Sequence, residues 1–146
     1  MTPYARFRQI MIDVLQRIWI DNDLDAIDDI YQPDAEIHGM VPGTVLGPRE
    51  FREVIEQYST LSRLDGFTIH DVFVDSDDRA AFRITLQVTS FANGRTAPQD
   101  CSIFMTLRDG RIAATHNYVD LMGYFEMVGA LPEHTAYMLL AGGTFK

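Results

Sequence analysis

The sequence predicts an α+β domain in which helices come first and a curved antiparallel sheet follows. In the first part of the chain, apolar residues recur every three or four positions, the spacing typical of amphipathic helices. From Gly66 onward, apolar and polar residues alternate, as they do in half-buried strands. With 146 residues, the chain is expected to form a single domain, residues 1–146.

Three helices and one short strand are predicted before the sheet. The helices are expected at residues 3–20, 23–31 and 48–61. Proline suits the first turn of the first and third helices, and Asp23 is expected to N-cap the second helix, which Pro33 ends. The short strand is expected at residues 34–39, and a glycine- and proline-rich loop follows it.

Four longer strands are predicted in the second part of the chain. They are expected at residues 67–74, 80–88, 101–107 and 112–120. Asn93-Gly94 and Asp109-Gly110 are hairpin signals, because these residue types tolerate positive φ angles. An antiparallel sheet covered on one face by helices leaves a hollow suited to a small molecule.

The last predicted strand carries the most informative row of side chains. Strand side chains alternate, so the sequence places Ile112, Ala114, His116, Tyr118 and Asp120 on one face. The row begins with apolar residues and ends in an imidazole, a phenol and a carboxylate. We therefore expect it to form one wall of the cavity.

Composition excludes several classes of function. The net charge of −9 opposes binding to phosphate backbones or anionic lipid, so neither nucleic acid nor membrane is an expected partner. No apolar run has the ~20 residues of a membrane span, and no signal-peptide core is visible. The single cysteine, Cys101, cannot form an internal disulfide and fits a cytoplasmic location.

Three segments together resemble the NTF2-like (cystatin-like) superfamily and, within it, the SnoaL-like polyketide cyclases. They are YQPDAEIHG at residues 31–39, GTVLGPREFREVIEQY at 43–58 and DGRIAATHNYVDLMGYFEMVGALP at 109–132. The third segment is the most specific, because it combines a glycine turn, a strand that ends in Asp and a following helix. The resemblance implies a cone-shaped fold with an internal cavity.

The resemblance also implies chemistry without a metal or a cofactor. Cyclases of this family close an aldol ring with an acid/base carboxylate at the end of the last strand, a position that Asp120 occupies here. His116 stands where a Trp is common, and Glu126 or Met127 stands where a Gln is common. The related Δ5-ketosteroid isomerases carry an Asp base at the position of Gly39, which argues against their usual chemistry here.

The candidate catalytic residues are Asp120, His116 and His38. Asp120 is expected either to carry a proton at the cavity or to N-cap the helix that begins at Leu121, and the two roles are compatible. His116 and His38 are expected to orient or share that proton, with His38 entering the cavity from the opposite strand. A metal site formed by these two histidines and Asp120 is possible in ligand type, but no closely spaced ligand pair supports it.

A second group of residues is predicted to contact the substrate. Its members are large and apolar or carry a phenol that can hydrogen-bond to a carbonyl, namely Trp19, Tyr31, Tyr58, Tyr118, Phe82 and Met105. The alternative for each residue is an ordinary core position with any hydroxyl group satisfied.

Two functions remain open at this point. One is a cofactor-free acid/base enzyme of cyclase, isomerase or dehydratase type that acts on an apolar, carbonyl-bearing small molecule. The other is a protein that binds such a ligand without chemistry. A homodimer is expected in either case, through the outer face of the sheet. The outward row that would form this interface is Arg83, Thr85, Gln87 and Thr89.

Overall fold

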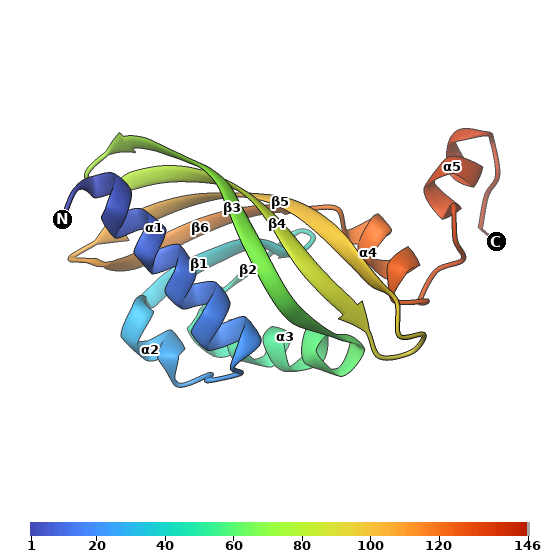
Figure 1. The fold of residues 1–146 in the computed structure, drawn as a ribbon, viewed down its shortest axis with the longest axis horizontal. Coiled ribbons are helices and arrows are strands. Elements are labelled where there is room, and N and C mark those ends of the chain that lie inside the picture. The colour runs from blue at the N-terminus through green and yellow to red at the C-terminus, as the bar shows by residue number, and fades with distance from the viewer. Residues whose placement is uncertain (146) are drawn as a thin grey trace.

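The computed structural model describes residues 1–145 and shows the N-terminal helices packed against one face of a curved, six-stranded sheet, while the last helix stands apart from the sheet (Figure 1). The helical segments are α1 (Pro3–Asp13), η1 (Val14–Ile20), α2 (Ala26–Ile30), α3 (Pro48–Leu61), α4 (Leu121–Met127) and α5 (Thr135–Leu140). The strands are β1 (Tyr31–Val41), β2 (Thr44–Leu46), β3 (Ser62–Ser76), β4 (Arg79–Ser90), β5 (Thr96–Arg108) and β6 (Arg111–Val119). The α+β class and the curved sheet are therefore as predicted.

The sheet is mixed, which corrects the expectation of a wholly antiparallel one. Its strand order is β2-β1-β6-β5-β4-β3, and β1 pairs with β6 in parallel while every other pair is antiparallel. A parallel neighbour requires a long connection, and here the chain between β1 and β6 contains a helix and most of the sheet. The sequence pattern gives residue faces but no strand partners, so it could not reveal this pairing.

The first helix changes its geometry halfway along. It is α-helical from Pro3 to Asp13 and then continues as the π-helical segment η1, in which the Asp21 amide donates to the Gln16 carbonyl at 2.8 Å. Thr2 caps the start of α1 with its side chain. Wide turns of this kind often occur at functional sites.

Several element boundaries differ from the sequence prediction. Strand β3 begins at Ser62 rather than Phe67, and β5 begins at Thr96 rather than Cys101. The second helix begins at Ala26, and its N-cap is Asp25 rather than Asp23. The strand expected at residues 34–39 is longer, since β1 begins at Tyr31 and runs through Pro33 to Val41. The extended backbone that residues preceding a proline prefer is compatible with a strand here.

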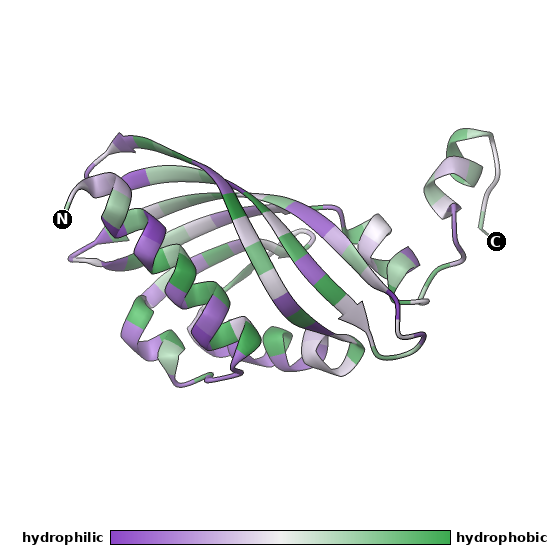
Figure 2. Cartoon of the chain, in the orientation of Figure 1, coloured by the Kyte–Doolittle hydropathy of each residue, from purple (hydrophilic) through white to green (hydrophobic). Residues whose placement is uncertain are grey.

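The core lies between the concave face of the sheet and the helices. Hydrophobic residues alternate with polar ones along the strands (Figure 2). The largest fully buried side chains come from both layers and include Phe7, Met11, Ile18, Phe82, Ile84 and Ile112. A smaller apolar cluster, formed by Val88, Tyr124, Met127 and Val128, joins α4 to the far end of the sheet.

Strands β1 and β6 approach each other closely at Gly39. This residue has a φ of +88°, and a Cβ built on it would collide with the backbone carbonyl of Asn117 on β6. The pairing register of β1 with β2 shifts between His38 and Val41, on either side of Gly39. Only glycine combines this backbone conformation with so short an approach.

Replacing Gly39 with Ala is therefore expected to lower the free energy of unfolding by about 3 kcal/mol, from the strained φ angle and the collision together. Gly43 is the matched control, because its φ is +74° and no atom lies near its built Cβ. Gly43→Ala is expected to cost about 1 kcal/mol, from the φ angle alone. Denaturant unfolding measures both, and equal losses would contradict the close approach.

Candidate functional site

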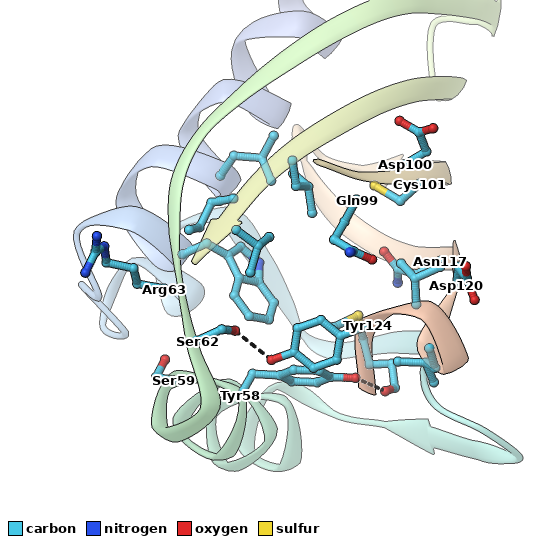
Figure 3. Close-up of a pocket in the computed structure, with 18 of the residues that line it drawn as sticks. Tyr58, Ser59, Ser62, Arg63, Gln99, Asp100, Cys101, Asn117, Asp120 and Tyr124 are labelled. Carbon is cyan, nitrogen blue, oxygen red and sulfur yellow. Dashed lines mark hydrogen bonds between the residues drawn. The ribbon is translucent and has the colours of Figure 1, made fainter. Parts of the chain in front are cut away.

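A cavity of about 180 Å³ lies between the sheet and the helices, near α4 (Figure 3). Most of its lining is apolar and comes from η1, β1, β3, β4 and β5, with Leu15, Trp19, Met40, Leu64, Leu86, Val88 and Ile103 among the contributors. Polar side chains gather on the remaining wall and at the rim, and include Tyr58, Ser62, Gln99, Asn117, Asp120 and Tyr124. A mostly apolar lining with a few polar groups is typical of a small-molecule site.

A small annex of about 30 Å³ extends the lining toward the core. It shares Leu15, Trp19, Met40, Ile103 and Asn117 with the main cavity. Its other lining residues are Met11, Val14, Tyr31, Phe51, Met105 and Thr115. Its size suits one water molecule or one small ligand group.

A β-bulge in β6 decides which side chains enter the cavity. Leu107 pairs with Ile112 and Thr106 pairs with Ala114, so Ala113 is an extra residue in β6. After the bulge the alternation reverses, and Thr115, Asn117 and Val119 face inward. The prediction that His116 and Tyr118 share the inward face of Ile112 is therefore wrong.

The two predicted histidines meet on the outer face of the sheet. The rings of His38 and His116 stack with their centroids 4.2 Å apart and their planes 17° from parallel. His38 Nε2 lies 3.4 Å from a carboxylate oxygen of Glu36, also on β1. Neither histidine lines the main cavity or its annex, so the structure does not bring them together with Asp120.

Asp120 lines the cavity and also caps α4. Its Oδ1 accepts a hydrogen bond from the Gly123 amide at 2.9 Å, which makes it the N-cap residue. A Cβ built on Gly123 would collide with Oδ2, so the glycine leaves room for the second carboxylate oxygen. No hydrogen bond joins Oδ2 to another residue within 1–145. Both predicted positions of Asp120, at the cavity and at the helix cap, are thus observed.

Tyr58 and Tyr124 form the aromatic end of the cavity, with ring centroids 5.5 Å apart. The Tyr58 hydroxyl donates to the Met40 carbonyl at 2.9 Å, and burial, with a smaller effect of Tyr124, raises the pKa of Tyr58 to about 12. The Tyr124 and Ser62 hydroxyls are 2.6 Å apart. Burial raises the pKa of Tyr124, and the Ser62 hydrogen bond partly opposes this shift. Both phenols therefore remain protonated near neutral pH.

The other predicted substrate contacts lie in four different places. Trp19 lines the cavity and packs edge-to-face on Tyr58. Tyr31, whose pKa is raised by burial, and Met105 line the annex but not the main cavity. Phe82 is a core residue against Phe7, and Tyr118 lies on the outer face against Phe104.

Sequence reasoning missed several residues of the site, chiefly Asn117, Tyr124, Ser62, Gln99 and Met40. Asn117 was overlooked because the bulge at Ala113 has no marker in the sequence. Tyr124 could have been found from the sequence, because it lies four positions after Asp120, the residue that caps the helix, and such positions are neighbours on a helix. In the structure it packs in the same apolar cluster as Met127.

No group of three or more His, Cys, Asp and Glu side chains within residues 1–145 is arranged to hold a metal ion. In that same range, no helix is long and apolar enough to cross a membrane.

Comparison with known protein families agrees with the fold. The model of the SnoaL-like domain matches residues 13–115, more than two thirds of the chain. The chain therefore belongs to the SnoaL-like domain family. A comparison with curated proteins gave no significant match.

Solved structures of the same fold have low sequence identity to this chain. TsrD from Streptomyces laurentii is 21% identical with a TM-score of 0.69, and the alignment covers 87% of this chain and 97% of TsrD. A proposed isomerase from Bacillus subtilis is 17% identical with a TM-score of 0.75, covering 90% and 98%. A proposed polyketide cyclase from Xanthomonas campestris is 17% identical with a TM-score of 0.68, covering 87% and 99%. At this identity, the likeness establishes the NTF2-like fold alone.

Cys101 provides a chemical test of the cavity. Its thiol lines the cavity but is almost inaccessible, and burial, with a smaller effect of Asp100, raises its pKa to about 12. Because the thiolate is the reactive form, the folded protein is expected to react very slowly with Ellman's reagent at mildly alkaline pH. Unfolding in guanidinium should release one reactive thiol at once. Rapid reaction of the folded protein would contradict this burial.

Proposed function

We propose that the protein is a cofactor-free acid/base enzyme that acts on a small, apolar, carbonyl-bearing molecule held in this cavity. The observation that supports it is the position of Asp120 at the exposed rim of a mostly apolar cavity. One carboxylate oxygen is fixed by the Gly123 amide, and the other makes no hydrogen bond with the described residues. A carboxylate held in this way can accept a proton from a bound substrate without losing its position.

In this mechanism, Asp120 removes a proton from the carbon next to a substrate carbonyl. Negative charge then develops on the carbonyl oxygen, and a nearby donor has to stabilise it. The Tyr124 and Ser62 hydroxyls share one hydrogen bond, in which only one of their two protons is used. The other proton can be donated to the substrate oxygen. The resulting enolate could attack a second carbonyl, as in ring closure, or take the proton back at another carbon, as in isomerisation.

Hydrogen–deuterium exchange tests the proposed proton transfer without knowledge of the natural substrate. Indanone is a compact probe with exchangeable protons next to its carbonyl, and proton NMR in deuterated buffer follows their loss. The wild-type protein is expected to accelerate the exchange. Asp120→Asn is expected to reduce the acceleration at least ~100-fold, because it removes the base.

Asp120→Asn is a sharp test because Asn is as good an N-cap residue as Asp. The variant should therefore keep its thermal stability, whereas Asp120→Ala should also lose about 1 kcal/mol with the cap. Unchanged exchange in a stable Asp120→Asn variant would contradict the role of Asp120 as the base.

The alternative function is ligand binding without chemistry. The observation that favours it is the location of His38 and His116 on the outer face, which leaves Asp120 without a histidine partner in the cavity. Saturable binding of indanone to the wild-type protein, with no acceleration of exchange, would support this alternative over the enzyme.

We also propose that the protein forms a homodimer through the outer face of the sheet. The predicted row is mostly engaged within the sheet, since Arg83 binds Asp71 and Thr85 donates to Asp100. Beside it lies an apolar patch formed by Phe73, Phe104 and Tyr118, whose exposed fractions are 64%, 52% and 63%. Large exposed aromatic groups gathered on one face are typical of a protein–protein interface.

Sedimentation equilibrium at micromolar concentration tests this interface. The wild-type protein is expected to have the mass of a dimer, and Phe104→Arg the mass of a monomer, because it places a charge at the centre of the apolar patch. Met138→Arg adds the same charge on the exposed face of α5 and is expected to remain dimeric. A monomeric wild-type protein would contradict the proposal.

The environment of Cys101 supports a further proposal, a cytoplasmic location. The chain has one cysteine, and its thiol is buried and unpaired in the structure. Unpaired thiols are usual in the reducing cytoplasm.

A further inference from the structure

Asn117 is the polar residue at the junction between the cavity and its annex. Its side chain enters from the middle of the sheet on β6 and lines both spaces, as Figure 3 shows for the main cavity. Its amide nitrogen, Nδ2, donates to the His38 carbonyl at 2.9 Å and to the Thr115 hydroxyl at 3.1 Å. Both amide protons therefore have partners within the protein.

These partners determine which way the amide points. A backbone carbonyl can only accept a hydrogen bond, so the group facing the His38 carbonyl must be the NH₂ group. Rotating the amide by half a turn would place two acceptors against each other. The close approach at Gly39 keeps this carbonyl next to Asn117. The amide oxygen, Oδ1, is thus held on the side away from His38.

Oδ1 is an acceptor without a partner in the described part of the chain. The Asn117 side chain makes two hydrogen bonds, and Nδ2 donates both of them. Across residues 1–145, the only fully buried side-chain nitrogen or oxygen without a partner is Arg6 Nε. Oδ1 therefore remains accessible, and the space next to Asn117 is the cavity and its annex. A ligand that carries an O–H group can satisfy it.

The other polar groups of the cavity favour a neutral ligand. Tyr58 already donates its proton to the Met40 carbonyl, so its oxygen is also an acceptor. Arg63 is the only cationic side chain among the described lining residues, and it is paired with Asp65 at 2.7 Å. Asp120 adds a negative charge at the same site. An anionic ligand would therefore meet a carboxylate with no available cation to balance its charge.

The volume of the cavity limits the size of the ligand. An apolar cavity of roughly 150 Å³ in another protein holds one benzene molecule. At about 180 Å³, this cavity accommodates one ring with a short substituent, or two fused rings that reach its open end.

We propose that Asn117 Oδ1 is a specificity-determining acceptor that selects a compact, neutral ligand of one or two rings carrying a hydroxyl group, phenolic or enolic. This inference rests on the proposed use of the cavity as the ligand site. The hydroxyl binds Oδ1 near the annex, while the apolar ring lies against Trp19 and Leu86. Asn117 binds and orients the ligand, and Asp120 remains the group that moves a proton.

Calorimetric binding of two probes of equal size tests the proposal. Para-ethylphenol carries the hydroxyl group, and para-ethyltoluene replaces it with a methyl group. The wild-type protein is expected to bind the phenol at least ten-fold more tightly, because the methyl group leaves Oδ1 unpaired. Equal binding, tighter binding of the toluene, or no binding of either probe would overturn the inference.

Two variants assign the preference to one residue. Asn117→Leu removes the acceptor at similar volume and is expected to reduce the preference for the phenol at least ten-fold. Gln99→Leu removes another amide from the cavity wall and is expected to keep the preference. Loss of the preference in Gln99→Leu but not in Asn117→Leu would overturn the assignment. Thermal melting checks that each variant folds. If a variant does not fold, the comparison of the two probes on the wild-type protein still tests the proposal.

The two proposals can fail separately. A wild-type protein that prefers the phenol but does not accelerate exchange of indanone protons would support the Asn117 acceptor and contradict the enzyme. A protein that accelerates exchange through Asp120 but shows no preference for the phenol would support the enzyme and overturn the inference about Asn117.

Discussion

The close approach of β1 to β6 at Gly39 and Asn117 is the constraint on which the rest of the structure depends. Strands β1 and β2 connect α2 to α3, so their place in the sheet positions the helical layer over the concave face (Figure 1). The same approach brings the His38 carbonyl to Asn117 and orients its amide. One backbone contact thus determines both the closure of the cavity and the chemistry of its inner wall.

The bulge at Ala113 gives β6 two separate roles. On its inner face, Thr115, Asn117 and Val119 line the cavity or its annex. On its outer face, His116 and Tyr118 lie beside Phe104 in an open groove of mixed polarity. The inner row is suited to a small ligand and the outer row to association with another protein surface. A strand without the extra residue would exchange these two faces.

Local features of the structure could be predicted from the sequence because they depend on neighbouring residues. The amphipathic helices, the alternation in β4 and the capping of α4 by Asp120 all belong to this class. The parallel pairing of β1 and the bulge at Ala113 could not be predicted. Both depend on contacts between distant segments, and two successive alanines give no sign of which one is the extra residue. Because Ala113 is an extra residue, Asn117 lies at the cavity wall where the sequence predicted His116.

We propose that the cavity between η1, β6 and α4 is the ligand site, and Asn117 and Asp120 line this cavity. A crystal structure of the protein with para-ethylphenol tests whether the ligand binds there. We expect electron density for the ring inside the cavity, with the hydroxyl oxygen within hydrogen-bonding distance of Asn117 Oδ1. Density only in the outer groove beside His116 and Tyr118, with an empty cavity, would contradict it.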